Sequence, residues 1–196
     1  MQKQTHHTLL EIFDELRSEK VLVRGFREGD ADAQYEAIVE SRERLRPWLP
    51  WVDHYASVED SQDFVIRSRA RWLLREDFAV GLFDVTSGRF LGGSGLHPRN
   101  WDVGFFEIGY WIRTSAEGNG YVTDAVKLLT DFAIERLNAR RVMIRCDVRN
   151  TRSAAVAERL GFVREGLLRN DQLDTTGHVR STLIFSRTPD DPRWPR

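Results

Sequence analysis

The sequence predicts a single α/β (α+β) domain in which helices flank a mixed, mostly antiparallel sheet. Apolar residues alternate with polar ones in several short runs, as they do in half-buried strands. In other segments they recur every three or four residues, which is the spacing of an amphipathic helix. The predicted order of elements is β-α-α-β-β-β-α-β-α-β-β, and the helices that separate single strands indicate a sheet of mixed direction.

The composition indicates one folded domain without an overall charge. The chain of 196 residues is long enough for one substantial core, and its 41% hydrophobic and 30% charged residues are ordinary for a globular protein. Lys and Arg (29) nearly balance Asp and Glu (30), so we expect neither a nucleic acid nor a membrane as a partner. The chain shows no apolar run that could cross a bilayer and no signal-peptide pattern, and a cytoplasmic location is expected.

The first half of the chain is predicted to be mainly helical. Apolar residues at helical spacing predict a short helix that ends near Ser18, within an N-terminal helical extension of residues 1–19. Asp30 is a suitable N-cap for the next helix, and Pro47 and Pro50 interrupt the chain after it. The expected elements are helices at 9–18, 30–45 and 58–76 and a strand at 20–26.

The second half is predicted to contain most of the sheet. Thr86, Ser87 and Gly88 have the composition of a hairpin turn between two alternating runs. Gly161 stands where a left-handed residue commonly ends a helix. We expect strands at 77–85, 89–97, 103–113, 140–148, 162–171 and 178–187 and helices at 122–137 and 150–161. The domain is expected to span residues 20–188, followed by a tail at 189–196.

A glycine pair separates a predicted strand from a predicted helix in IGYWIRTSAEGNGYVTDAV, residues 108–126. The first turn of a helix has unpaired N–H groups and a partial positive charge, and glycine allows an anion to approach them. Gly118 and Gly120 therefore indicate a phosphate site at the carboxyl end of the strand. Taken alone, such a pair more often makes only a tight connection between two elements.

Three blocks of the sequence carry a resemblance to a known family. They are RPWLPWVD (46–53), EIGYWIRTSAEGNGYVTDAV (107–126) and NTRSAAVAERLGFVREG (150–166). The chain resembles the GCN5-related N-acetyltransferases, the GNAT superfamily, and within it the RimJ/RimL-like branch, from Val21 to Ser186. The resemblance implies a single-domain GNAT fold with splayed central strands. It also implies acetyl-CoA as cosubstrate and transfer of its acetyl group to a primary amine.

The resemblance implies where acetyl-CoA binds. Backbone N–H groups of the glycine turn would hold the pyrophosphate, with Thr123 as a hydroxyl donor, and Asn150 would bind the pantetheine arm. The acetyl carbonyl would lie against main-chain donors of the splayed strand. Asn150 could also cap the helix that follows it, and both roles are compatible. The implied cofactor-binding residues are Trp111, Ile112, Arg113, Gly118, Asn119, Gly120, Tyr121, Val122, Thr123, Asn150 and Ser153.

The glycine turn departs from the family's motif at both of its outer positions. Glu117 places a carboxylate where the family has a basic or neutral side chain, and Val122 stands where the family has Gly or Ala. A carboxylate disfavours a nearby pyrophosphate unless its side chain points away. Arg113 is the candidate to compensate for this charge.

Two carboxylates are candidate general bases. Glu107 lies on the strand that is expected to line the cleft, and it could act through a water. A cross-strand ion pair with an arginine is an equally weighted interpretation of Glu107. Asp171 is the second candidate, because some relatives carry the base on that strand. Its neighbour Gln172 cannot serve as a base.

The departing thiolate also needs a partner. Many members of the superfamily use a tyrosine on the helix that follows Asn150, but residues 157–159 contain none. Ser153 is the remaining candidate, as an acid or only as a hydrogen-bond donor to the sulfur. Cys146 shares strand parity with apolar residues, so we interpret it as core packing rather than as a nucleophile.

The acceptor would bind beside the loop at 46–53. The candidate substrate-binding residues are Trp48, Trp51 and Asp53. The alternative is that the two tryptophans only pack the loop onto the domain. Arg180 stands where the family often has Asp, which leaves the acceptor's preferred charge open. The histidines lack the spacing of metal ligands, and no metal is expected.

Together these features predict an acetyl-CoA-dependent N-acetyltransferase that works by direct attack of the acceptor amine. The first choice of acceptor is the N-terminal amine of a protein, and a small-molecule amine or antibiotic is the alternative. A non-catalytic acyl-CoA-binding module is the alternative of another class. A homodimer is compatible with the sequence but is not required by it.

Overall fold

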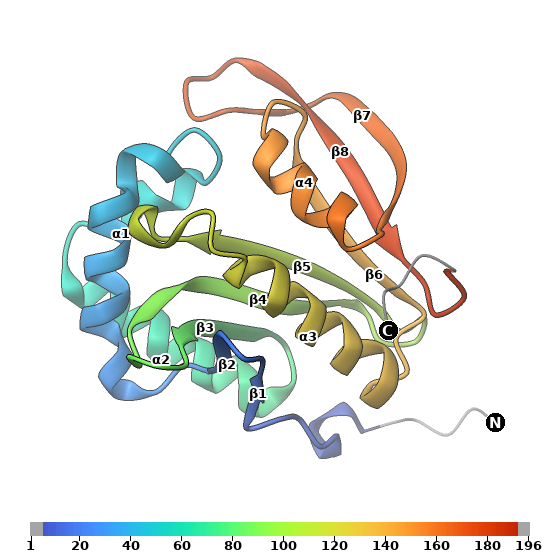
Figure 1. The fold of residues 1–196 in the computed structure, drawn as a ribbon, viewed down its shortest axis with the longest axis horizontal. Helices are drawn as coiled ribbons and strands as arrows, with labels where there is room; N and C mark the ends of the chain where they lie inside the picture. Colours follow the sequence, from blue (N-terminus) through green and yellow to red (C-terminus); the bar gives the residue numbers. More distant parts are fainter. Residues whose placement is uncertain (1–5, 192–196) are drawn as a thin grey trace.

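A computed structural model of the chain describes residues 6–191 and arranges them as one eight-stranded sheet with helices on both faces (Figure 1). The spatial order of strands is β1-β2-β3-β4-β5-β6-β8-β7. The strands are β1 (Glu15–Arg17), β2 (Val21–Gly25), β3 (Phe78–Asp84), β4 (Phe90–Asn100), β5 (Phe105–Ile112), β6 (Arg141–Asp147), β7 (Val163–Leu173) and β8 (Val179–Arg187). The α-helices are α1 (Ala31–Leu45), α2 (Val58–Leu74), α3 (Tyr121–Arg136) and α4 (Thr151–Arg159). Short 3-10 helices lie at His7–Leu9, Glu28–Asp30, Pro50–His54 and Thr114–Ala116.

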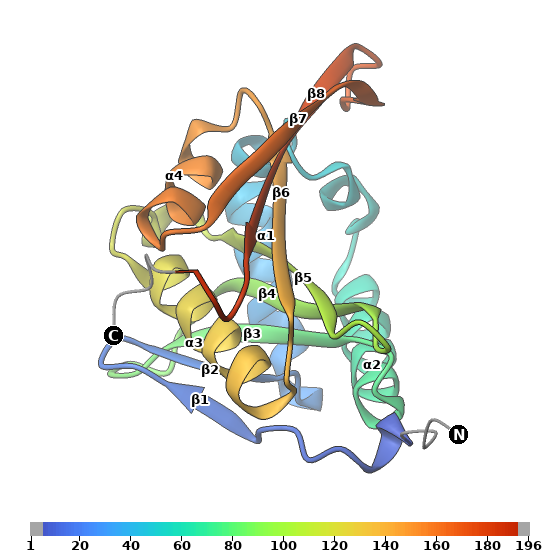
Figure 2. The same cartoon turned by 90° about the vertical axis from the view of Figure 1, so that its right-hand side faces the viewer.

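The helices cover the two faces of the sheet with separate cores. Figure 2 shows α3 and α4 on one side of the sheet and α2 on the other. Phe106, Ile108 and Leu129 belong to the core beneath α3 and α4, whereas Val65 and Phe83 belong to a core beneath α1 and α2. None of the helices in residues 6–191 is both long and apolar enough to span a membrane.

The central strands β5 and β6 are the only parallel neighbours in the described sheet, and they separate soon after they meet. Their pairing covers Phe105–Glu107 against Arg141–Met143 and then stops. The strand that follows α3 must run parallel to the strand before it, because the helix returns the chain to the starting edge. The remaining parts of β5 and β6 diverge as a V, which confirms the predicted splayed strands (Figure 1).

The predicted N-terminal helix is wrong. Residues 15–17 form β1, which pairs antiparallel with β2, and the preceding helical segment is a single 3-10 turn. Ile12, Phe13 and Leu16 do pack on the core, as their apolar pattern suggested. They reach it from an extended chain because the open edge of β2 supplies backbone partners that an isolated short helix lacks. The other predicted elements are confirmed to within three residues.

Candidate active site

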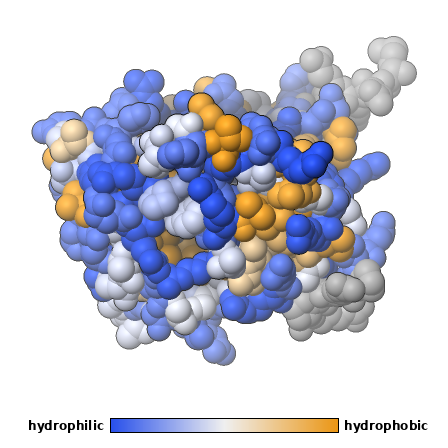
Figure 3. All heavy atoms as spheres, turned by 90° about the horizontal axis from the view of Figure 1, so that it is seen from above, coloured by the Kyte–Doolittle hydropathy of each residue, from blue (hydrophilic) through white to orange (hydrophobic). Residues whose placement is uncertain are grey.

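A cleft of about 1320 Å³ opens where β5 and β6 diverge. Its walls come from the second half of β5, the loop before α3, the first turns of α3 and α4, and the end of β6. Most of the predicted cofactor-binding residues line it. These are Trp111, Ile112, Gly118, Asn119, Gly120, Tyr121, Val122, Thr123, Asn150 and Ser153. From above, hydrophilic residues predominate on the surface and apolar ones gather in a few patches (Figure 3).

The glycine turn has a backbone that other residues rarely adopt. Gly118 and Gly120 have φ angles of 80° and 84°, and Gly120 is the N-cap of α3. Asp124 N–H donates to Gly120 O, so the N–H groups of the three preceding helical residues have no acceptor within the helix. They line the cleft together with the helix's positive dipole end. This arrangement suits a phosphate anion.

Basic side chains surround the glycine turn, and two of them form ion pairs with the Glu117 carboxylate. The Glu117 carboxylate accepts from Arg44 Nε at 3.2 Å and from Arg152, so its charge is paired. A Cβ on Gly120 would lie 3.8 Å from Lys20 Nζ. Lys20, Arg44, Arg152 and Glu117 all line the cleft. Sequence reasoning missed the three cations, because Lys20 and Arg44 come from elements far from the motif.

Arg113 does not compensate for Glu117, contrary to the expectation. Its side chain is 3% exposed and points under α1, away from the cleft. The guanidinium donates to Glu40 at 2.8 Å, to Glu36 at 2.7 Å and to the carbonyl of Phe90 at 3.2 Å. Its place next to the glycine motif suggested a cofactor role. Its side chain instead leaves β5 toward α1, where the two carboxylates bind it.

Glu40 should make the stability of the protein depend on pH in the acid range. The hydrogen bond from Arg113 lowers the pKa of Glu40 from 4.5 to about 2, although partial burial acts in the opposite direction. A carboxyl whose pKa is lower in the folded state stabilises the fold above its unfolded pKa, and this stabilisation disappears as pH falls from 4.5 to about 2.

We therefore expect the free energy of unfolding of wild type to exceed that of Glu40→Gln near neutral pH. The difference should shrink steadily between pH 4.5 and 2. Urea titrations of both proteins at a series of pH values measure it. A difference that stays constant over this range would contradict the assignment.

Asn150 begins α4 and holds its first turn. Its side-chain oxygen accepts from Ser153 N at 3.1 Å, which is the geometry of an N-cap. The capping interpretation of Asn150 is therefore confirmed. Asn150 also lines the cleft.

Asn150→Ala should lower the free energy of unfolding by about 1 kcal/mol, because the N–H of Ser153 loses its acceptor. Asn150→Ser retains a capping oxygen and should stay within a few tenths of a kcal/mol of wild type. Urea denaturation of the three proteins measures both values. Equal losses in the Ala and Ser variants would show that the cap contributes nothing.

Tyr110 supplies a hydroxyl that sequence reasoning missed. Its OH donates to the carbonyl of Ser153 at 2.9 Å, and Ser153 Oγ lies 3.1 Å from the same OH. Burial raises the pKa of Tyr110, so the phenol stays protonated. Burial also raises the pKa of the Cys146 thiol, which agrees with its interpretation as an inert residue. The cleft therefore has a tyrosine near Ser153, contributed by β5 rather than by α4.

The open edge of β5 provides main-chain donors, although not all of the expected ones. Arg113 N–H donates to Leu91 O on β4 at 2.7 Å. Because N–H groups alternate between the two edges of a strand, the N–H of Trp111 also points to β4. The N–H groups of Tyr110 and Ile112 then point across the gap toward β6. Tyr110 and Ile112 are thus better placed than Trp111 to donate to an acetyl carbonyl.

Glu107 lines the cleft, but both of its oxygens are engaged. Oε2 accepts from Arg99 Nε at 2.9 Å and Oε1 accepts from Arg145 Nε at 3.2 Å. The side chain is 13% exposed. Of the two interpretations drawn from the sequence, the cross-strand ion pair is the one present in this structure.

Asp171 lies outside the cleft. It is exposed, whereas its neighbour Gln172 lines the cleft and bonds to Arg180. Adjacent strand residues point to opposite faces, and a register irregularity between Leu168 and Gln172 sets which of the two faces inward. The structure therefore does not bring Asp171 to the other candidate residues.

The acceptor loop contributes fewer cleft residues than expected. Trp48 lines the cleft. Trp51 instead packs against Tyr55 and Trp111, with ring centroids 5.5 Å and 5.8 Å away. Asp53 is exposed and accepts from Arg46 Nε at 3.0 Å. Packing thus explains Trp51, and only Trp48 of the three lines the cleft.

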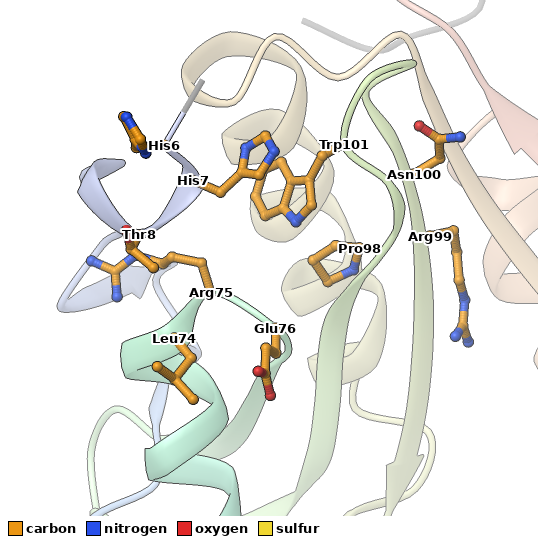
Figure 4. Close-up of a pocket in the computed structure, with 10 residues that line it drawn as sticks. All are labelled: His6, His7, Thr8, Leu74, Arg75, Glu76, Pro98, Arg99, Asn100 and Trp101. Carbon is orange, nitrogen blue, oxygen red and sulfur yellow. The ribbon is translucent and has the colours of Figure 1, made fainter. Parts of the chain in front are cut away.

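A second, smaller cavity of about 540 Å³ lies near the end of α2 (Figure 4). His7 stacks on Trp101 there, with ring centroids 4.6 Å apart. Figure 4 shows Arg99 on β4 at the same cavity, and this residue also pairs with Glu107. None of the residues that line this cavity belongs to the glycine turn. Within residues 6–191, no group of three His, Cys, Asp or Glu side chains is placed to hold a metal ion.

Comparisons with known proteins find acetyltransferases that are similar to this chain over most of its length. The curated Bacillus subtilis protein named "Putative ribosomal N-acetyltransferase YdaF" is 32% identical over 170 residues, which cover 86% of this chain and 91% of that protein. The ribosomal-protein-serine acetyltransferase of Escherichia coli is 27% identical and covers 78% of this chain and 84% of its own. The ribosomal-protein-S5-alanine acetyltransferase structure from Vibrio fischeri has a TM-score of 0.81 at 21% identity, over 93% of this chain and 99% of that one, and shows the same fold.

A family model matches most of the domain. It is described as an acetyltransferase (GNAT) domain and matches residues 20–163, which is more than half of the chain. The matched range begins just before β2 and contains the splayed strands, the glycine turn and α4. The chain therefore belongs to the GNAT acetyltransferase family.

Proposed function

We propose that this protein transfers the acetyl group of acetyl-CoA to the N-terminal amine of a protein. One observation carries the proposal: a glycine turn at the start of α3 opens onto the gap between β5 and β6, with unpaired N–H groups on both sides of the same cleft. Acetyl-CoA is the acetyl donor of the family. The two E. coli and B. subtilis relatives are named for ribosomal proteins, which supports a protein acceptor.

The residues of the cleft fit the chemical parts of acetyl-CoA. The glycine turn and the nearby cations Lys20 and Arg152 suit its phosphates. In this proposal Asn150 binds the amides of the pantetheine arm, and Ser153, with Tyr110 beside it, lies near the thioester sulfur. The dense set of donors on one wall is what a long, polar, anionic cosubstrate requires.

The reaction is a direct transfer. The acceptor nitrogen attacks the carbonyl carbon, an N–C bond forms, and the C–S bond breaks with its electron pair left on sulfur. Main-chain N–H groups of Tyr110 and Ile112 stabilise the charge that develops on the carbonyl oxygen. The Ser153 hydroxyl, which donates to Tyr110 OH in this structure, would turn to donate to the thiolate, while Tyr110 OH stays bonded to the carbonyl of Ser153. One proton must leave the nitrogen, and for an α-amine with a pKa of about 8 this demand is mild.

The test measures thiol release from acetyl-CoA with peptides that begin with Ser or Ala. The matched controls are the same peptides with a blocked N-terminus and an internal lysine. We expect turnover only with free α-amines, and mass spectrometry should place the acetyl group on the first residue. Turnover with blocked peptides would contradict α-amine specificity.

A small-molecule amine is the second candidate acceptor, because the same cleft would admit one. Polyamines and aminoglycosides are therefore assayed in parallel. Turnover with these compounds alone would reassign the acceptor. Tight acetyl-CoA binding without turnover of any amine would instead favour a non-catalytic acyl-CoA-binding module.

A further inference from the structure

His97 and Asp77 form a pair on the face of the sheet that α1 and α2 cover. His97 Nδ1 and Asp77 Oδ1 are 2.5 Å apart, and their side chains are 29% and 21% exposed. A carboxylate can only accept, so Nδ1 carries a proton, and in the neutral form of the ring Nε2 has a lone pair that can accept another. Among residues 6–191, none hydrogen-bonds to Nε2. The pair thus presents one free proton acceptor in a fixed orientation.

Glycines beneath the imidazole determine where Nε2 points. A Cβ on Gly95 would lie 2.4 Å from His97 Cε1 and 2.5 Å from Nε2, so the ring rests directly on this glycine. Gly109 is the cross-strand partner of Gly95, and a Cβ there would lie 3.8 Å from Nε2. The free nitrogen of His97 therefore lies beside Gly109, which lines the cleft, although His97 itself is not one of the lining residues.

Gly109 is an uncovered part of the cleft floor. It is exposed and lines the cleft. Two residues further along β5, the Trp111 indole lies over Gly93 in the same way that His97 lies over Gly95. The exposed backbone of Gly109 thus lies between the Trp111 ring and His97 Nε2. A small group such as an amine fits this position, and a larger residue at 109 would fill it.

The same face of the sheet carries Glu107. His97 and Glu107 are direct cross-strand partners, so both side chains leave the sheet on one side. The Glu107 oxygens are held by Arg99 and Arg145, whereas Nε2 of His97 is free. Of these two neighbours, His97 is the one with an unoccupied basic atom.

We propose that His97, oriented by Asp77, is the general base that takes the proton from the acceptor amine, directly or through one water. This proposal rests on the proposed acetyltransferase function. As the N–C bond forms and the C–S bond breaks, the proton on the attacking nitrogen passes to Nε2. The resulting imidazolium is stabilised by the Asp77 carboxylate and later returns the proton to solvent, while the thiolate takes up a proton of its own.

Asp77 and Gly95 are positioning residues in this proposal. Asp77 keeps the proton on Nδ1, and Gly95 leaves room for the ring. Glu107 has a different role: it neutralises Arg99 and Arg145 beside the bare floor, so that the amine does not meet two unpaired cations.

The first experiment compares wild type, His97→Ala and Glu107→Gln in the thiol-release assay with the peptide acceptor. We expect kcat of His97→Ala to fall about a hundredfold, which is the usual contribution of a general base. The KM for acetyl-CoA should stay within about twofold of wild type. Free imidazole added to the assay should raise the rate of His97→Ala in a saturable manner. It should not raise the rate of Glu107→Gln, which retains His97.

Two further variants test the positioning. Asp77→Asn should lower kcat without rescue by imidazole, because the ring still fills its place but can carry its proton on Nε2. Gly95→Ala should lower kcat because the new Cβ displaces the ring. Gly166→Ala is the matched control: a Cβ there meets nothing within 4 Å, and kcat should be unchanged.

The outcomes separate this proposal from the proposed function. If wild type acetylates none of the amines, the proposed function fails. If wild type is active and His97→Ala keeps its kcat, the base assignment is overturned. The assignment is also overturned if His97→Ala folds as judged by its circular dichroism, loses activity and gains nothing from imidazole. Rescue of His97→Ala alone supports it.

Discussion

Replacement of Arg113 by methionine should lower the free energy of unfolding by about 1.5–3 kcal/mol, the usual contribution of hydrogen bonds to charged groups, because both carboxylates keep contact with water. The guanidinium is nearly inaccessible and donates to Glu36, Glu40 and the carbonyl of Phe90. Methionine fills a similar volume but removes the donor to Phe90 O and to both carboxylates, of which Glu40 keeps the backbone N–H of Ser115. The urea midpoint should fall while the m value stays the same, because the surface exposed on unfolding hardly changes.

A matched control for this prediction is Arg67→Met. Arg67 pairs with Asp63 one turn away on α2, and both side chains are more than 60% exposed. Exposed pairs of this kind contribute at most about 0.5 kcal/mol, so the control should be close to wild type. A loss below about 1 kcal/mol for Arg113→Met would mean that solvent reaches the network and that the buried pair adds little.

Gly120→Val should weaken acetyl-CoA binding at least about tenfold. The φ angle of Gly120 is 84°, and a side chain in this region costs roughly 1–2 kcal/mol, more when it is β-branched. The free turn relieves this strain by leaving the conformation that binds the anion, so binding must restore it, and about 1.4 kcal/mol corresponds to tenfold in affinity. The valine methyls would also stand between the anion and the N–H groups that begin α3. Calorimetric titration with acetyl-CoA measures the dissociation constant.

Two variants separate backbone strain from the loss of the binding site. Gly88→Val imposes a similar strain, since Gly88 has a φ angle of 70° and open space around it, but it lies in the hairpin between β3 and β4. It should leave acetyl-CoA affinity unchanged. Gly120→Asn should lose less affinity than Gly120→Val, because Asn tolerates left-handed backbone. Affinities near wild type for all three would contradict a phosphate site at this turn.

Most of the fold and one wall of the cleft could be predicted because they depend on local patterns. Alternation, helical spacing and caps are properties of short segments, and all eleven predicted strands and helices from β2 to β8 lie at their expected places. Gly118 and Gly120 have positive φ angles, as an anion-binding turn requires. The N-terminal helix failed because its apolar spacing also suits an extended segment, and the edge of β2 decides between them.

The positions of the other candidate residues depend on contacts between residues that are far apart in the sequence. Arg113 was assigned to the cofactor from its position in the motif, but carboxylates more than 70 residues away on α1 hold it elsewhere. The orientation of Asp171 follows from an irregular strand pairing that has no sequence signature. His97 and Asp77 are 20 residues apart and meet only across two strands. Burial and partner choice of this kind are not encoded in a single short segment.

The segment before β2 also affects how the domain can be divided. Ser18 Oγ donates to Asp124 Oδ2 at 2.9 Å and accepts from the N–H of Val21 at 3.1 Å, so it joins the β1–β2 connection to the first turns of α3. A chain shortened to begin at residue 20 would keep the whole range matched by the family model. It would nevertheless remove β1, expose the edge of β2, and release a tie to the helix that carries the glycine turn. We therefore expect the stable domain to include β1 and Ser18, which precede the first residue of the family model.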